Sequence, residues 1–340
     1  MRLFSRCGKF PGRLEVVKTC LAGALVVCLC LTGGVDTAQA TDLQQLIEQV
    51  GPVYGEAYSS PFIHAFGPNQ NSNLYSTANI PWGGLTFGVG IKVMGTNLNE
   101  ADQTFQTVVR IDDLGDLDPG HAGVSGMAVM SGPTIFGDTE TDGRVDLYAN
   151  GAFVGSIDGI PGFWDTRWVP MATPEAYIGG IFGLKATVRY FPSMKLGDIG
   201  NSEYLGYGLQ WSASGVLEDF PIDLMVGFFT QSLDVENTQG LGEDKLIDSN
   251  ANSYFLAISK SWPALTVYGG FAIESSDMKV AYYFEDPDFP DLAQDVSFSV
   301  DGRQDQRFTL GITLDILLEL NVEAGFGDMT TYSAGLMIGF

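Results

Sequence analysis

The segment Leu85-Thr-Phe-Gly-Val-Gly-Ile-Lys-Val93 carries a large apolar side chain at every second position, with threonine, glycine or lysine between them. Side chains of a β-strand point alternately to opposite faces of its sheet, so this strand has one apolar face and one small or polar face. A soluble sandwich would bury the apolar face in a core, whereas a membrane barrel would turn it outward to lipid. Features elsewhere in the sequence distinguish between these two architectures.

The same alternation recurs along the chain. Strong copies occupy residues 265–274, 307–315 and 318–326, and weaker copies occupy residues 184–190, 205–211 and 222–228. Segments of about 9 to 11 residues span a bilayer at a tilt, whereas strands of soluble proteins average about 5 to 6 residues. Aromatic residues gather near the segment ends, as they do at membrane interfaces: Tyr190, Phe191, Trp262, Tyr282, Tyr283, Tyr332 and Phe340. We therefore predict an all-β fold, an antiparallel transmembrane β-barrel of about 14 strands, with 12 as the alternative.

Residues 1–40 have the pattern of a secretory signal peptide. Five basic residues precede or flank the apolar stretch from Cys20 to Leu31, and Ala38-Gln39-Ala40 is a small-x-small cleavage site. Twelve apolar residues are too few to cross a hydrocarbon core of about 30 Å as a helix. We expect cleavage after Ala40 and export to the outer membrane. All four cysteines lie in this segment, so the mature chain has no disulfide, cysteine metal site or cysteine nucleophile.

The charge excludes one class of partner. The whole chain has a net charge of −24, and removing the five basic and two acidic residues of the signal leaves 12 basic and 39 acidic residues, a net charge of −27. Such a chain repels phosphates, so we predict no nucleic-acid binding. The acids concentrate in connections at residues 112–118, 234–248 and 285–295. Long acidic loops at one end and short turns at the other are typical of membrane barrels.

The mature chain divides into a short N-terminal segment and the barrel. Leu43, Leu46, Ile47 and Val50 share one face of a helix, which predicts a short helix over residues 41–50, followed by extended chain up to residue 80. An isolated helix of this length is marginal in water, so its apolar face must be buried. We expect residues 41–80 to form a plug in the lumen or at its periplasmic mouth, with a flexible tail as the alternative. Residues 81–340 are expected to form the barrel as one domain.

The C-terminal segment Ser333-Ala-Gly-Leu-Met-Ile-Gly-Phe340 alternates in register and ends on an aromatic residue. It resembles the signal that the outer-membrane assembly machinery reads, in which Gly335, Ile338 and Phe340 would be the recognised positions.

Four short stretches resemble a family of uncharacterised bacterial outer-membrane proteins that is classed as a domain of unknown function. They are Pro133-Thr-Ile-Phe-Gly137, Gly183-Leu-Lys-Ala-Thr-Val-Arg-Tyr-Phe-Pro192, Phe220-Pro-Ile-Asp-Leu224 and Leu265-Thr-Val-Tyr-Gly-Gly270. The resemblance covers nearly all of the mature chain, and it implies a barrel but no activity. The layout is also loosely similar to long-chain fatty-acid transporter barrels, at the level of the fold alone.

The polar faces of the predicted strands identify residues that we expect to face the lumen: Lys92, Lys185, Arg189, Asp223, Glu274, Arg307, Asp315, Glu319 and Glu323. Charges of both signs are interleaved, which favours a lumen filled by ion pairs, because an unpaired buried charge is costly. A barrel of 14 strands is also narrower than the 16 to 18 strands that leave an aqueous channel. We expect a monomer in contact with outer-membrane lipid and the assembly machinery, acting as a narrow or gated conduit for a small or apolar solute. The alternatives are a structural or surface-interaction barrel and an outer-membrane hydrolase.

Few residues support catalysis or metal binding. His64 and His121 are the two histidines of the chain, and neither has an acidic partner at a known catalytic spacing, so we predict no enzyme and no cofactor. Four acids in one segment resemble part of a Ca²⁺ loop, but position 12 is Ala149 and the bidentate carboxylate is missing. We therefore predict an acidic turn there, with a weak Ca²⁺ site as the alternative. Its candidate ligands are Asp138, Glu140, Asp142 and Asp146.

Overall fold

The computed structural model describes residues 37–112, 124–196, 200–217, 220–236, 245–286 and 289–340. Most of the predicted signal peptide, most of the acidic cluster at residues 112–118, and His121 lie outside the described residues.

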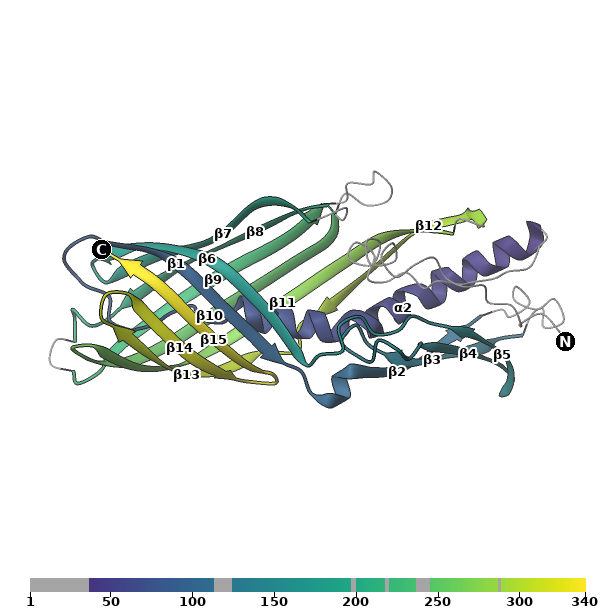
Figure 1. Cartoon of the computed structure of the whole chain (residues 1–340), viewed down its shortest axis with the longest axis horizontal. Coiled ribbons are helices and arrows are strands. Elements are labelled where there is room, and N and C mark those ends of the chain that lie inside the picture. The colour runs from purple at the N-terminus through teal and green to yellow at the C-terminus, as the bar shows by residue number, and fades with distance from the viewer. Residues whose placement is uncertain (1–36, 113–123, 197–199, 218–219, 237–244, 287–288) are drawn as a thin grey trace.

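Ten strands form a closed antiparallel barrel (Figure 1). Around the ring they are β1 (Thr86–Asn97), β6 (Trp168–Ile181), β7 (Leu184–Leu196), β8 (Gly200–Ser212), β9 (Asp223–Glu236), β10 (Lys245–Trp262), β11 (Leu265–Asp286), β13 (Gln306–Asp315), β14 (Glu319–Phe326) and β15 (Thr330–Gly339). Pairing of β10 with β11 and of β1 with β15 closes the ring. The predicted all-β antiparallel barrel is confirmed, whereas the predicted number of 14 strands, and the alternative of 12, is wrong.

The remaining elements form a second unit, which we call the module. It contains a four-stranded sheet of β2 (Thr104–Ile111), β3 (Gly126–Pro133), β4 (Arg144–Ala149) and β5 (Ala152–Asp158). The short helix η1 (Glu100–Gln103) precedes this sheet, and β12 (Phe289–Asp301) pairs with the second half of β11. Helix α2 (Thr37–Gln70) lies beside these strands and runs toward the barrel (Figure 1). Residues 81–340 are therefore not one continuous barrel, because β2–β5 form a separate sheet.

Helix α2 is much longer than the predicted helix over residues 41–50. Pro52, Pro61 and Pro68 lie inside it, and each removes a backbone N–H that would otherwise continue the helix. The hydroxyl of Ser60 donates to the carbonyl of Ala57, which is the acceptor that Pro61 leaves without its usual partner. Local pattern therefore predicted an early helix end, and tertiary packing overrides it.

That packing comes from the core of the module. Tyr54, Tyr58 and Ile63 of α2 are buried against the inner face of the four-stranded sheet on one side and the β11–β12 hairpin on the other. The sheet contributes Ile111, Ala128, Met130, Val145 and Leu147, and the hairpin contributes Met278, Val296, Phe298 and Val300. Apolar burial of this kind stabilises a helix that three prolines would weaken in isolation.

The outer wall of the barrel is apolar. On β1, the side chains of Phe87, Val89, Ile91 and Val93 are each about half exposed, while Lys92 and Met94 between and beside them are buried. The predicted alternation is therefore present, with the apolar face outward as in a lipid-facing wall. Among the described residues, no helix is both long enough and apolar enough to cross a membrane.

The seam between β1 and β15 ends at Phe340. Its backbone N–H donates to the carbonyl of Phe87, the N–H of Phe87 donates back, and the two rings stack at 5.3 Å. The last residue therefore holds the first strand of the barrel to the last.

Deletion of Phe340 is expected to lower the amount of folded barrel in the membrane more than it lowers the stability of the barrel that does form. The reason is that the two seam hydrogen bonds and the ring stack lie at one corner, where strands fray, while the residue also completes the assembly-signal pattern. Membrane levels and heat-modifiable migration on gels measure the two effects separately. Normal membrane levels of a chain ending at Gly339 would contradict the assembly role.

Candidate functional site in the barrel lumen

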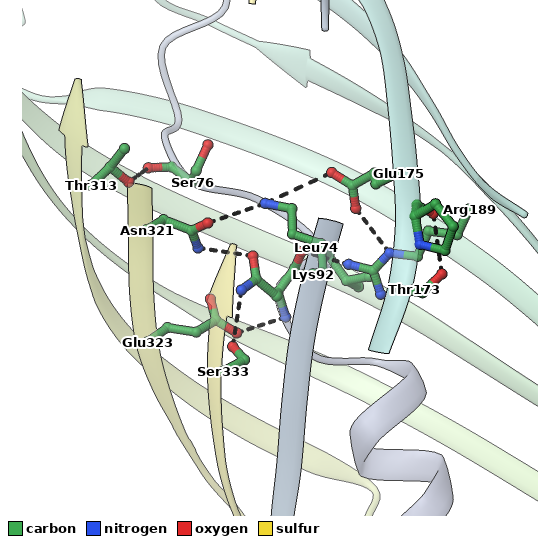
Figure 2. Close-up of polar contacts among 12 residues, drawn as sticks. Leu74, Ser76, Lys92, Thr173, Glu175, Arg189, Thr313, Asn321, Glu323 and Ser333 are labelled. Atoms are coloured by element: carbon green, nitrogen blue, oxygen red, sulfur yellow. Dashed lines mark hydrogen bonds and ion pairs between the residues drawn. The ribbon is translucent and has the colours of Figure 1, made fainter. Parts of the chain in front are cut away.

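The lumen is occupied by the chain's own residues 69–80, which we call the lumen segment. Most of its side chains are buried, among them Asn69, Asn73 and Tyr75. It comprises the last two residues of α2 and most of the chain that leads from there to β1, and Figure 2 shows it passing between strands of the wall. Wall side chains that point into the lumen therefore lie close to the lumen segment and can bond to it.

One cluster of charges centres on Arg189 of β7, whose side chain is fully buried. Its Nε donates to Glu175 Oε2 of β6 at 2.9 Å, and its Nη1 donates to the carbonyl of Gln70 at 3.0 Å. Nη2 donates to the carbonyl of Asn73. Lys92 approaches the other oxygen of Glu175 at 3.8 Å (Figure 2). The cluster thus joins three wall strands to two carbonyls of the lumen segment.

A second cluster centres on Arg307 of β13. Its Nη2 lies 3.1 Å from Glu274 Oε2 and 2.6 Å from the carbonyl of Pro68, and its Nη1 donates to the hydroxyl of Ser72 at 2.7 Å. Gln304 donates to the same Glu274 oxygen at 2.9 Å. Both arginines therefore combine a buried carboxylate partner with acceptors at the end of α2.

These two arginines complete the C-terminus of helix α2. The last carbonyls of a helix lack partners within the helix and carry partial negative charge. Arg307 donates to the carbonyl of Pro68, and Arg189 together with the amide of Gln231 donates to the carbonyl of Gln70. The helix end is thus held inside the wall by cations, the arrangement that the helix dipole favours.

Asn73 turns the chain immediately after this helix end. Its φ of 55° is in the left-handed region, which asparagine tolerates better than most residues. Its backbone N–H donates to Glu323 at 2.7 Å, its side-chain amide donates to Ser333 at 3.1 Å, and its side-chain oxygen accepts from Asn321 at 2.8 Å (Figure 2). The backbone and side-chain polar groups of Asn73 are therefore all bonded to the wall.

The rest of the lumen segment is held mainly by neutral groups. Gln210 donates to the carbonyl of Leu74, Thr313 to that of Ser76, and Ser212 to that of Ala78. Tyr75 packs against Phe255 and Tyr268, with ring centroids 5.0 Å and 5.7 Å away. A Cβ at Gly270 would collide with the Tyr75 hydroxyl, so glycine at that position of β11 makes room for the ring.

A vestibule remains between the lumen segment and the wall, with a volume of about 190 Å³. Lys92, Glu175, Lys185 and Glu319 line it, together with Tyr177, over whose ring Lys185 lies at 5.1 Å. This small cavity has charges of both signs.

The structure places the nine lumen candidates in three groups. Lys92, Arg189, Glu274, Arg307 and Glu323 are buried; Arg189, Arg307 and Glu323 contact the lumen segment, Glu274 contacts Arg307, and Lys92 contacts Glu175 and Asn321 of the wall. Lys185 and Glu319 line the vestibule. Asp223 accepts from Ser214 and Ser259 near the strand end, and Asp315 is exposed at the start of a turn.

Sequence reasoning missed several polar residues of the lumen. Glu175, Gln231 and Asn321 each bond to a charged side chain or to the lumen segment. Asn321 lies in the alternating segment 318–326, in register with Glu319 and Glu323, but it is uncharged and the lumen prediction rests on charged residues. The run Asn69-Gln-Asn-Ser-Asn73, rich in amide side chains, was the available signal for a chain that must satisfy polar groups in a closed space.

The acidic turn does not gather ligands. Asp138 accepts from the backbone of Glu140 and the hydroxyl of Thr141, while Asp146 pairs with Arg144 at 2.6 Å. Within the residues that the structure describes, no three or more His, Cys, Asp or Glu side chains come together where they could hold a metal ion.

Comparison with known proteins identifies a family. A family model matches residues 17–340, and it describes a family of unknown function (DUF6588). No curated protein matches the chain. Among solved structures, OmpT, an outer membrane protein of Vibrio cholerae, is 12% identical with a TM-score of 0.24, covering 76% of this chain and 100% of that chain. Pseudomonas putida OprB is 9% identical with a TM-score of 0.21, covering 76% and 94%.

Proposed function

The chain belongs to the family of unknown function DUF6588, and we propose that it is a plugged outer-membrane barrel whose role is to anchor the module. The observation that carries this proposal is the lumen segment, which hydrogen-bonds to side chains from strands all around the ring. A lumen filled in this way supports a structural or surface-interaction barrel over an open pore.

The outer wall supports placement in a membrane. Its exposed residues form an apolar surface, and aromatic pairs lie at both ends of β1, with Phe87 beside Phe340 at one end and Trp168 beside Tyr332 at the other. Aromatic girdles of this kind flank the lipid-facing band of outer-membrane barrels. With the signal-peptide pattern of residues 1–40, this supports export, cleavage after Ala40, and a monomer that meets lipid and the assembly machinery. We assign the barrel no catalytic role and no cofactor.

Ten strands argue further against an open conduit. Open aqueous channels belong to barrels of 16 to 18 strands, whereas about eight strands leave an interior that side chains fill. Here the lumen additionally holds Arg189, Arg307 and a backbone segment. Ion flow would require that the lumen segment move.

The vestibule supports a second candidate, a gated conduit for a small solute. It borders residues 75–81, and within this stretch the carbonyls of Ser76 and Ala78 accept neutral hydrogen bonds from Thr313 and Ser212 and none from the arginine clusters. Because neutral bonds are weaker than charge-assisted ones, this half of the segment is the part that a gate would move.

An engineered disulfide distinguishes the plugged anchor from the gated conduit. Thr77 Oγ1 lies 3.3 Å from Ser259 Oγ of β10, and both atoms occupy the positions that cysteine sulfurs would take. The double variant Thr77→Cys, Ser259→Cys is expected to oxidise readily, since the mature chain has no other cysteine. For a plugged anchor, planar-bilayer conductance stays at the baseline level whether this bond is oxidised or reduced. Conductance that appears only after reduction would instead establish a gate.

The matched control is Thr77→Cys with Ser249→Cys. Ser249 is also buried and lies on the same face of β10, but ten residues away, or roughly 33 Å along a strand. This pair is expected not to form a disulfide. Failure of the Thr77–Ser259 pair to oxidise in folded barrels would overturn the plugged arrangement itself.

A further inference from the structure

The two ends of the barrel can be told apart by the strands and connections that lie at each of them. β1 begins and β15 ends at one end, where the backbones of Phe87 and Phe340 bond to each other. We call this the C-terminal end. The module lies at the other end, because β2 follows the far end of β1 and β12 pairs with the half of β11 that is remote from its turn with β10. Figure 1 shows the C-terminus and the module at opposite ends of the barrel.

The lumen segment runs from one end to the other. Near its start, Asn69 bonds to Thr96 and to the carbonyl of Val169, where β1 ends and β6 begins, beside the module. Just past its end, the indole of Trp82 donates to the carbonyl of Ser212, and the carbonyl of Trp82 accepts from Phe182 in the β6–β7 turn at the C-terminal end. The chain therefore traverses the whole barrel before it enters β1.

The connections show which end faces the periplasm. At the C-terminal end, β6–β7, β10–β11 and β13–β14 are joined by short turns, and β8–β9 is joined by residues 213–222. At the module end, β7–β8 and β14–β15 are joined by residues 197–199 and 327–329, whereas the chain between β1 and β6 contains η1 and four strands and the chain between β11 and β13 contains β12. Outer-membrane barrels have short periplasmic turns and long extracellular loops.

The outward face of β11 gives an independent indication. It is apolar at Leu265, Val267 and Ile273 near the C-terminal end, and it then becomes polar at Ser275 and Asp277. The neighbouring β10 changes in the same place, because Tyr254 pairs with Ile273, while Asn252 and Asn250 follow toward the module. The strands at the module end thus extend beyond the apolar band, as strands do when they project from the outer leaflet.

We propose that the module faces the cell exterior and that α2 reaches it through the barrel's own lumen. This inference rests on the proposed function and assigns its direction. It places the exposed Val108, Met127 and Phe153 of the four-stranded sheet in the external medium. It also requires that the chain ahead of β1 be inside the barrel before the seam between β1 and β15 closes.

Single cysteines test the direction, since the mature chain has none. Glu56→Cys lies on the exposed side of α2, Thr139→Cys in an exposed turn of the module, and Leu317→Cys in the β13–β14 turn, where Leu317 is 92% exposed. Intact cells are treated with a maleimide that does not cross the outer membrane. We expect labelling at positions 56 and 139 and none at position 317, and labelling of all three after permeabilisation.

The labelling results test the orientation of the module, whereas the disulfide tests the plugged barrel. Labelling of position 317 alone in intact cells, or of no position before permeabilisation, would overturn the surface orientation. Labelling of position 139 without position 56 would overturn the passage of α2 through the lumen. The Thr77–Ser259 disulfide, measured in the same cells, reports the plugged barrel independently of its direction.

Discussion

Replacing Arg189 by methionine is expected to lower the free energy of unfolding of the barrel by about 3–5 kcal/mol, the range for breaking one side of a buried ion pair. Glu175 would keep only Lys92, at 3.8 Å, and the carbonyls of Gln70 and Asn73 would lose their guanidinium partner. Methionine fills much of the arginine volume, so the loss is mainly electrostatic. Urea unfolding of the barrel in detergent or lipid vesicles measures it.

Two further variants make the result specific. Arg144→Met removes an ion pair with Asp146 at an exposed site of β4, and the unfolding midpoint is expected to stay unchanged. Adding Glu175→Gln to Arg189→Met is expected to lower the stability further, because the buried Lys92 then has no carboxylate partner and keeps only its bond to Asn321. Equal losses from Arg189→Met and Arg144→Met would show that the lumen cluster does not hold the barrel.

The strands that the sequence predicted are those whose two faces differ strongly. β1, β13 and β14 have apolar outward faces and small or polar inward faces, so their alternation is visible. β10 was missed because Phe255 and Ala257 on its inward face pack against Tyr75 and its neighbours, which makes both faces partly apolar. The pattern of a wall strand is thus obscured where the lumen itself has an apolar core.

β6 was missed for a different reason. It contains Pro170 and Pro174, and proline inside a strand argues against a central position in a sheet. Both prolines lie in the part of β6 that pairs with β1, before its pairing with β7 starts at Glu175. A missing N–H is tolerated there because one edge of the strand has no neighbour.

The predicted number of barrel strands was wrong because an alternating apolar pattern does not reveal whether the apolar face of a strand contacts lipid or a protein core. The described residues contain 15 strands, close to the predicted number, but β2–β5 and β12 lie outside the ring. Their apolar faces meet helix α2, whereas those of the barrel strands face outward. The charged lumen residues were identified from the same alternation, but the two arginines also donate to the backbone carbonyls of Pro68, Gln70 and Asn73, which no side-chain pattern reveals.

Tyr54→Ala is expected to unfold or loosen the module while the barrel persists. The Tyr54 ring is fully buried, packs edge-on against Phe105 at 5.1 Å and stacks on Tyr58, so truncation costs about 3–5 kcal/mol, the range for large aromatic residues. Burial raises the pKa of Tyr54 to about 12, and the neutral hydroxyl accepts from the N–H of Ile160 at 3.1 Å. Limited proteolysis of the folded protein, read together with heat-modifiable migration, follows the module and the barrel separately.

Tyr54→Phe is the matched control, because it keeps the ring and leaves only the Ile160 N–H without its acceptor, at a cost of about 1–3 kcal/mol. We expect cleavage within the module to be much faster for Tyr54→Ala than for Tyr54→Phe, with a protected barrel in both. That difference follows from the two separate cores, one around α2 in the module and one around Tyr75 in the lumen. Simultaneous loss of heat-modifiable migration in Tyr54→Ala would show instead that module and barrel fold as one unit, and the module could not then be regarded as a cargo that the barrel merely anchors.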